Sequence, residues 1–234
     1  MDQWINERCW HNGKYIRGNI KAVALCFHGL NAGFKTDASP LDFALAESNI
    51  LAVSPYYGPW SWMNRQARAF VDELLDHLFD CLGNRELPLI VSGGSMGGCA
   101  ALLFCRYSRY TPIACDAVWP VCDTVAHFSE RPDLPPTFHH AFMGYPEPLE
   151  EILKEHSPLH QVEFMPHIPY QFTHGLEDVR VNKNIHSDRM VKALKELGHQ
   201  VEYAEVPYCG HGVSVPLSVT LRRVEFIRRF AGVQ

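Results

Sequence analysis

The fold of this chain is decided by one stretch, LPLIVSGGSMGGCA, at residues 87–100. The apolar run Leu87–Ser92 is typical of a strand buried on both faces, and an apolar helix follows over Gly98–Tyr107. Between them, residues 93–97 match the pattern G-x-S-x-G, which places Ser95 at the tip of a strand–turn–helix. A phosphate-binding glycine loop is the alternative. The stretch lacks the Gly-Lys-Ser/Thr ending of that loop and the spacing of a dinucleotide fingerprint.

Similar apolar runs on both sides of this stretch predict the other strands, at Ala22–Phe27, Ile50–Ser54, Ile113–Val118, Ile168–Thr173 and Val201–Val206. Amphipathic helical patterns lie between them, at residues 39–48, 67–82, 190–197 and 221–230. Strands that alternate with helices indicate βαβ units and a mostly parallel sheet with helices on both faces. We therefore expect one α/β domain over residues 1–234.

Two segments depart from this pattern. Asn12-Gly13 is a favoured hairpin turn pair and predicts a hairpin between Trp4–His11 and Lys14–Arg17. The proline- and aromatic-rich segment 122–167 predicts an irregular, lid-like insertion that is helical only at Pro148–His156.

Composition limits the classes of function. Of the 234 residues, 47% are hydrophobic and 20% charged, as in an ordinary folded domain, and the net charge of −5 argues against nucleic acid or an anionic membrane as a partner. No apolar stretch is long enough to span a bilayer, and the N-terminus carries acidic residues and no apolar run, so we expect no signal peptide. The eight cysteines form no Cys-x-x-Cys pair. We expect them to be free thiols in a cytoplasmic protein.

Two polar positions follow later strands and complete a candidate catalytic set with Ser95. Asp178 follows the strand Ile168–Thr173, and His211 follows the strand Val201–Val206. In a parallel sheet these strand ends lie along one edge, so the three side chains are expected to meet there. A serine nucleophile needs a histidine base and an acid that orients the base. His28 is an alternative base, and Glu177 and Asp123 are alternative acids.

These residues, in the order Ser…Asp…His, resemble the α/β-hydrolases. The matching pieces are His28-Gly29, residues 93–97, Ser157-Pro158, residues 174–178 with Val181, and Gly210-His211-Gly212, spread over nearly the whole chain. The second half of the chain is most similar to the catalytic domain of the prolyl-oligopeptidase group and to its small esterase relatives. Because fewer than thirty residues precede the first core strand, we expect no β-propeller of the kind that those peptidases carry. The resemblance implies an oxyanion hole from the backbone N–H groups of Leu30 and Met96, with Asn31 as an alternative to Leu30.

Aromatic side chains on the same sheet edge are the candidates for substrate binding. Tyr57, Trp60 and Trp62 follow the strand Ile50–Ser54, and Trp119 follows the strand Ile113–Val118. The alternative for each is ordinary loop packing. The histidines at 139, 140, 156, 160 and 167 lack the spacing of a metal-binding motif, so we expect neither a metal nor an organic cofactor.

The sequence therefore predicts a serine hydrolase that cleaves small-molecule carboxylic esters through an acyl-enzyme. The aromatic residues favour acetyl, feruloyl or other aryl or sugar esters. A peptidase of the prolyl-oligopeptidase type without a propeller is the first alternative. A non-catalytic α/β-hydrolase-like binding protein is the second.

Overall fold

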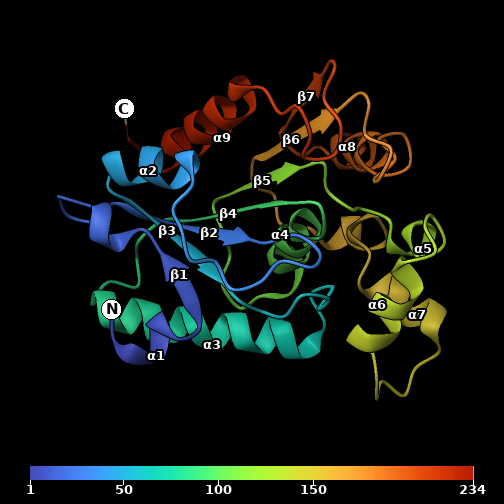
Figure 1. Cartoon of the computed structure of the whole chain (residues 1–234), viewed down its shortest axis with the longest axis horizontal. Helices are drawn as coiled ribbons and strands as arrows, with labels where there is room; N and C mark the ends of the chain where they lie inside the picture. The colour runs from blue at the N-terminus through green and yellow to red at the C-terminus, as the bar shows by residue number, and fades with distance from the viewer. Residues whose placement is uncertain (234) are drawn as a thin grey trace.

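Within residues 1–233, which the computed structural model describes, seven strands form one sheet (Figure 1). The strand order is β1-β3-β2-β4-β5-β6-β7. Strands β2 to β7 run parallel, and only β1 runs antiparallel, at the edge beside β3. The strands are β1 (Cys9–His11), β2 (Ala22–Phe27), β3 (Ile50–Pro55), β4 (Leu89–Gly94), β5 (Ala114–Val118), β6 (Tyr170–Gly175) and β7 (Val201–Val206). This is the predicted α/β architecture.

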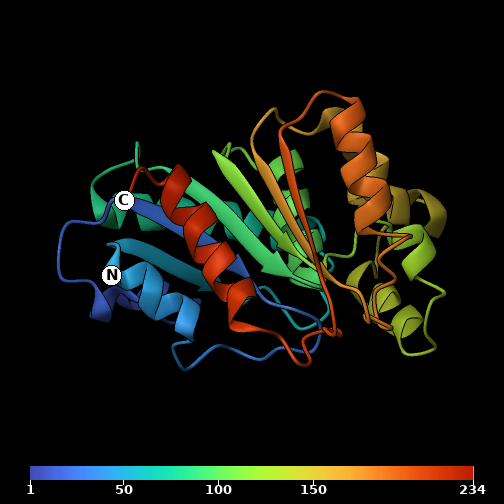
Figure 2. The same ribbon diagram turned by 90° about the horizontal axis from the view of Figure 1, so that it is seen from above.

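Helices cover both faces of the sheet, and alternate strand residues pack against different layers. Helices α2 (Pro40–Glu47) and α9 (Leu217–Phe230) lie side by side on one face, as Figure 2 shows from above. They pack on Ala22, Ala24 and neighbouring small residues. The other face packs against α1 (Gln3–Asn6), α3 (Arg65–Leu82), α4 (Met96–Tyr107) and α8 (Ser187–Glu196). No helix in residues 1–233 combines the length and apolar character needed to cross a membrane.

Helix boundaries follow from local capping chemistry. Ser39 begins α2 with a capping box, in which its hydroxyl accepts from the Asp42 amide and the Asp42 carboxylate accepts from the Ser39 amide. Gly83 ends α3 with a φ of 63°, a left-handed conformation that glycine adopts without steric cost. Both boundaries agree with the sequence prediction.

The predicted hairpin at Asn12-Gly13 is wrong. Residues 13–15 form a short 3-10 helix (η1, Gly13–Tyr15), and β1 pairs with β3 instead of with the residues that follow the turn. Asn12 has a φ of −84°, whereas the hairpin turn would require a positive value. Its fully buried side chain donates to the carbonyls of Asp42 and Ile50 and accepts from the amide of Ala52. Asn12 therefore joins β1, α2 and β3 and begins η1, and it is not part of a hairpin turn.

The segment 122–167 is more regular than predicted. It contains the helices α5 (Thr124–His127), α6 (Leu134–Ala141) and α7 (Leu149–Glu155) and the 3-10 helix η2 (Pro158–Phe164). The prediction of a single helix at Pro148–His156 missed the others. Prolines stand in the first turns of α6 and η2, where they start a helix without breaking one. The helices are also too short to show a clear apolar period.

We predict that Asn12→Ala lowers the free energy of unfolding by about 2–4 kcal/mol, because it leaves buried donor and acceptor groups of α2 and β3 without partners. Urea denaturation measures this. Asn84→Ala is the matched control, since Asn84 is exposed and its side chain, among residues 1–233, bonds only the nearby amide of Glu86. Equal, small effects of the two substitutions would show that the Asn12 contacts add nothing to stability.

Candidate active site

Ser95 sits on a strained turn between β4 and α4. Its backbone has φ 61° and ψ −125°, a region that side-chain-bearing residues rarely occupy. Two glycines make the turn sterically possible. A Cβ at Gly93 would lie 2.1 Å from the carbonyl oxygen of Gly97, and a Cβ at Gly97 would lie 2.3 Å from that of Phe27. The G-x-S-x-G pattern thus reflects backbone contacts that exclude any side chain.

The loops after β6 and β7 bring an acid and a histidine to Ser95. Nε2 of His211 lies 2.9 Å from Oγ of Ser95, and Nδ1 of His211 lies 2.7 Å from Oδ2 of Asp178. The three residues are far apart in the sequence and meet because their strands end at the same sheet edge. The structure therefore brings together the set that the sequence predicted.

Asp178 is held in its charged form. Burial acts to raise its pKa, but hydrogen bonds from His174, His211 and the amide of Val181 outweigh burial, so the pKa lies well below the ordinary value of an aspartate. Its Oδ1 accepts the amides of Arg180 and Val181 at 2.9 Å each. Oδ2 thus remains directed at His211, and the carboxylate fixes the imidazole with its proton on Nδ1.

The alternative bases and acids lie elsewhere. Nδ1 of His28 bonds the carbonyl of Gly29, and its ring stacks on Tyr57 with centroids 4.2 Å apart. Asp123 caps α5 and pairs with Arg189 at 2.7 Å. Glu177 is exposed. None of the three has a hydrogen bond to Ser95 or His211 within residues 1–233.

The loop at residues 28–31 lies against Ser95. A Cβ at Gly29 would be 3.8 Å from the Cβ of Ser95. The amide of Asn31 donates to the carbonyl of Pro59 at 3.0 Å, so it is occupied. In the described part of the chain, no hydrogen bond uses the amides of Leu30 or Met96. Of the two alternatives, the geometry favours Leu30 as the donor from this loop.

A cleft of about 220 Å³ opens over Ser95 and His211. Its other lining residues are Gly29, Leu30, Asn31, Trp62, His127, Arg131, Asp133 and Arg180.

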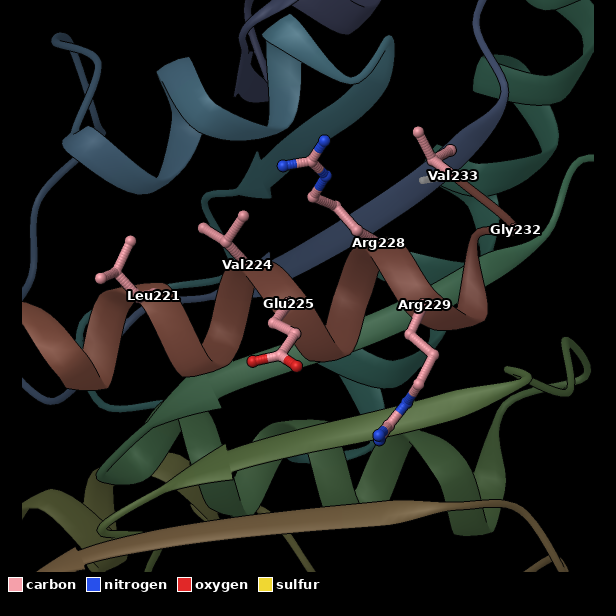
Figure 3. A pocket seen from close by; sticks show the side chains of 7 residues that line it. All are labelled: Leu221, Val224, Glu225, Arg228, Arg229, Gly232 and Val233. Carbon is pink, nitrogen blue, oxygen red and sulfur yellow. The ribbon is translucent and has the colours of Figure 1, made fainter.

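A larger hollow of about 760 Å³ lies beside α9 and shares no residue with this cleft. Figure 3 shows that Val224 and Arg228 point to one side of that helix and Glu225 and Arg229 to the other. Its polar groups therefore do not converge on a ligand.

The aromatic candidates differ in their placement. Tyr57 is buried, and its hydroxyl donates to the carbonyl of His28 at 2.7 Å. Trp60 donates its indole N–H to the side chain of Asn31. Trp62 lines the cleft but is only 1% exposed. Trp119 is half-buried, with its ring centroid 6.1 Å from that of His211. Trp62 thus lines the cleft and Trp119 lies near His211, while Tyr57 and Trp60 contact the loop 28–31.

Sequence reasoning did not single out a group formed by the buried His127 and His186 with the half-buried Glu130. Their potential metal-binding atoms lie within 4.8 Å of one another. Nδ1 of His186, however, accepts the amides of Cys122 and Asp123 at 3.2 and 3.1 Å, so the proton of this imidazole is on Nε2. A metal ion would need Nε2 unprotonated. We therefore interpret the group as hydrogen-bonded and not as metal-binding. No local sequence spacing indicates this group, because His186 is far from His127 and Glu130 in the sequence.

Comparisons with solved structures identify the same fold in peptidases and in an esterase. A puromycin-hydrolysing peptidase from Mycobacterium tuberculosis matches with a TM-score of 0.71 and 19% identity, over 91% of this chain and 34% of that one. An acylaminoacyl peptidase of Pyrococcus horikoshii matches with 0.73 and 16%, over 92% and 37%. This chain thus spans about a third of the length of these peptidases.

Esterase B from Lactobacillus rhamnosis matches with a TM-score of 0.71 and 13% identity, over 93% of this chain and 78% of that one. No curated protein matches the sequence. The profile of the prolyl oligopeptidase family, by contrast, matches residues 80–233, well over half of the chain, including Ser95, Asp178 and His211. With the α/β-hydrolase fold and this match, the chain belongs to the prolyl oligopeptidase family of serine hydrolases.

Proposed function

We propose that this serine hydrolase cleaves carboxylic esters of small molecules, with Ser95 as nucleophile, His211 as general base and Asp178 as the orienting acid. The observation that carries the serine-hydrolase mechanism is the continuous hydrogen-bond chain from Oγ of Ser95 through His211 to Asp178, at 2.9 and 2.7 Å. A non-catalytic binding protein would have no need of this chain or of the strained backbone at Ser95.

In the first half-reaction, Oγ of Ser95 attacks the acyl carbonyl while Nε2 of His211 takes the hydroxyl proton. Asp178 stabilises the imidazolium that forms. The amides of Leu30 and Met96 stabilise the negative charge on the carbonyl oxygen, each contributing about a hundredfold or more in rate. His211 then gives its proton to the departing alkoxide, which leaves an acyl-enzyme. Water, deprotonated by His211, hydrolyses the acyl-enzyme and restores Ser95.

Two observations favour an ester. The cleft, about 220 Å³, is at the small end for ligand pockets and fits a short acyl or alcohol group. Esterase B has the same fold, with a TM-score of 0.71, so this fold also carries ester hydrolysis. Tyr57 and Trp62 are buried with their polar atoms bonded inside the protein, so we do not base the proposal on aryl or sugar stacking. That preference stays a prediction.

A serine peptidase is the second candidate, and membership of the prolyl oligopeptidase family favours it. The same triad attacks esters and amides, so fold and triad do not separate the two.

All eight cysteines are free thiols and six are buried, which supports our proposal of a cytoplasmic location.

We predict that wild-type protein hydrolyses p-nitrophenyl esters from acetate to octanoate, with the shorter acyl chains preferred because the cleft is small. Ser95→Ala should lower kcat by roughly a thousandfold or more, since it removes the nucleophile. A fluorophosphonate probe should label the wild type and leave Ser95→Ala unlabelled. Activity on peptide anilides alone would favour the peptidase, and absence of labelling in the wild type would reject the triad. An aryl acyl ester in the series tests the aromatic preference.

We predict that Asp178→Asn lowers kcat by about 10³- to 10⁴-fold, because the carboxylate no longer fixes the His211 tautomer or stabilises its charge. Steady-state kinetics on the best ester measures this. Glu177→Gln removes the neighbouring, exposed carboxylate and should change kcat less than twofold. A comparable loss in both variants would argue against Asp178 as the specific partner of His211.

A further inference from the structure

The wall of the cleft contains a chain of three hydrogen-bonded side chains that the proposed mechanism does not use. Nδ1 of His127, on α5, bonds Oε2 of Glu130. The same oxygen lies 3.0 Å from Nε2 of His186. His127 and His186 are buried, with exposed fractions of 2% and 0%, and His127 lines the cleft together with Ser95 and His211. The chain therefore runs from the protein interior to the cleft wall.

The backbone fixes where the protons of this chain lie. Because Nδ1 of His186 accepts the amides of Cys122 and Asp123, Nε2 carries the proton and donates it to Glu130. Burial acts to raise the pKa of Glu130, but its hydrogen bonds with His127 and His186 lower the pKa to about 2. Glu130 is therefore a carboxylate. It accepts a second hydrogen bond, from Nδ1 of His127, which carries a proton.

His127 consequently presents an unprotonated nitrogen on its other edge. Burial lowers its pKa, so the ring is neutral, and with the proton on Nδ1 its Nε2 is a hydrogen-bond acceptor. The nearby indole N–H of Trp62 does not donate to this Nε2, because it donates to the hydroxyl of Thr137 at 2.9 Å.

Nε2 of His127 is open to a ligand. It has no hydrogen-bond partner among residues 1–233, and it is not one of the fully buried polar atoms that lack a partner, so it retains contact with solvent. The His127 side chain is only 2% exposed and it lines the cleft, so we infer that the solvent contact of Nε2 is with the cleft.

We propose that His127 is a specificity-determining residue, whose Nε2 accepts a hydrogen bond from a hydroxyl or N–H group carried by the substrate. The inference rests on the proposed ester hydrolysis at Ser95 and narrows its substrate class to esters that bear such a donor in their acyl or alcohol part. A plain alkyl group in this position would leave the acceptor without a partner and without water. Sites built to bond a donor group discriminate against analogues that lack it.

The test uses two pairs of esters of nearly equal shape. One pair differs in the acyl part, p-nitrophenyl 3-hydroxybutyrate against p-nitrophenyl 3-methylbutyrate. The other differs in the alcohol part, 2-hydroxyethyl butyrate against propyl butyrate, followed by pH-stat titration. We expect the wild type to prefer the hydroxylated member of at least one pair by about tenfold in kcat/KM, mainly through KM.

His127→Phe should abolish that preference. His127→Gln should retain part of it, because the side-chain carbonyl of glutamine can accept the hydrogen bond in place of the imidazole nitrogen. His139→Phe is the matched control, because His139 is exposed on α6 and does not line the cleft, and it should keep the wild-type preference. Fluorophosphonate labelling of each variant confirms a folded site.

Two results would overturn the inference: a wild type that prefers neither hydroxylated ester, or a His127→Phe variant that keeps the preference. Because the first uses unmodified protein, it holds even if the variant fails to fold. Ser95-dependent hydrolysis without donor preference rejects the role of His127 alone, whereas hydrolysis that survives in Ser95→Ala, or no ester hydrolysis at all, rejects the proposed function.

Discussion

The close approach of backbone to backbone around Ser95 is the constraint on which the site depends. Helix α4 starts so near β4 and β2 that Gly93 and Gly97 have no room for a Cβ. The strain at Ser95, of order 1–3 kcal/mol, persists because its amide donates to Val118 and its carbonyl accepts the amides of Cys99 and Val121. These bonds join the turn to β5 and to α4, so the nucleophile is held by the sheet itself.

The parallel sheet then decides what faces Ser95. Strands β6 and β7 end at the same sheet edge as β4, and the loops that follow them place Asp178 and His211 within hydrogen-bond distance of each other and of Ser95. A second close approach secures the two loops: a Cβ at Gly175 would lie 2.1 Å from the carbonyl oxygen of Cys209. Packing of backbone against backbone thus sets the distance from acid to base, as it sets the position of the nucleophile.

This explains why the sequence revealed the triad and most of the sheet. Glycines at fixed spacing indicate close contacts between backbone segments. Uniform apolar runs indicate strands that are buried on both faces. Where a side chain joins distant elements, no local pattern records it. Asn12 looked like a turn residue but bonds α2 and β3, and His186 orders His127 through Glu130 from another part of the chain. The short helices of segment 122–167 were missed for a related reason, since tertiary packing and not periodicity stabilises them.

The aromatic loop after β3 shows how a residue near the site can serve it without touching substrate. Tyr57 holds the carbonyl of His28, Pro59 accepts the amide of Asn31, and the indole of Trp60 holds the side chain of Asn31. A few residues on, Trp62 stacks on Phe138 of α6 at 4.1 Å. The loop therefore connects the proposed oxyanion turn to the segment 122–167 that carries His127. A shift of the segment 122–167 would therefore change the position of the turn beside Ser95, because the same short loop contacts the segment and the turn.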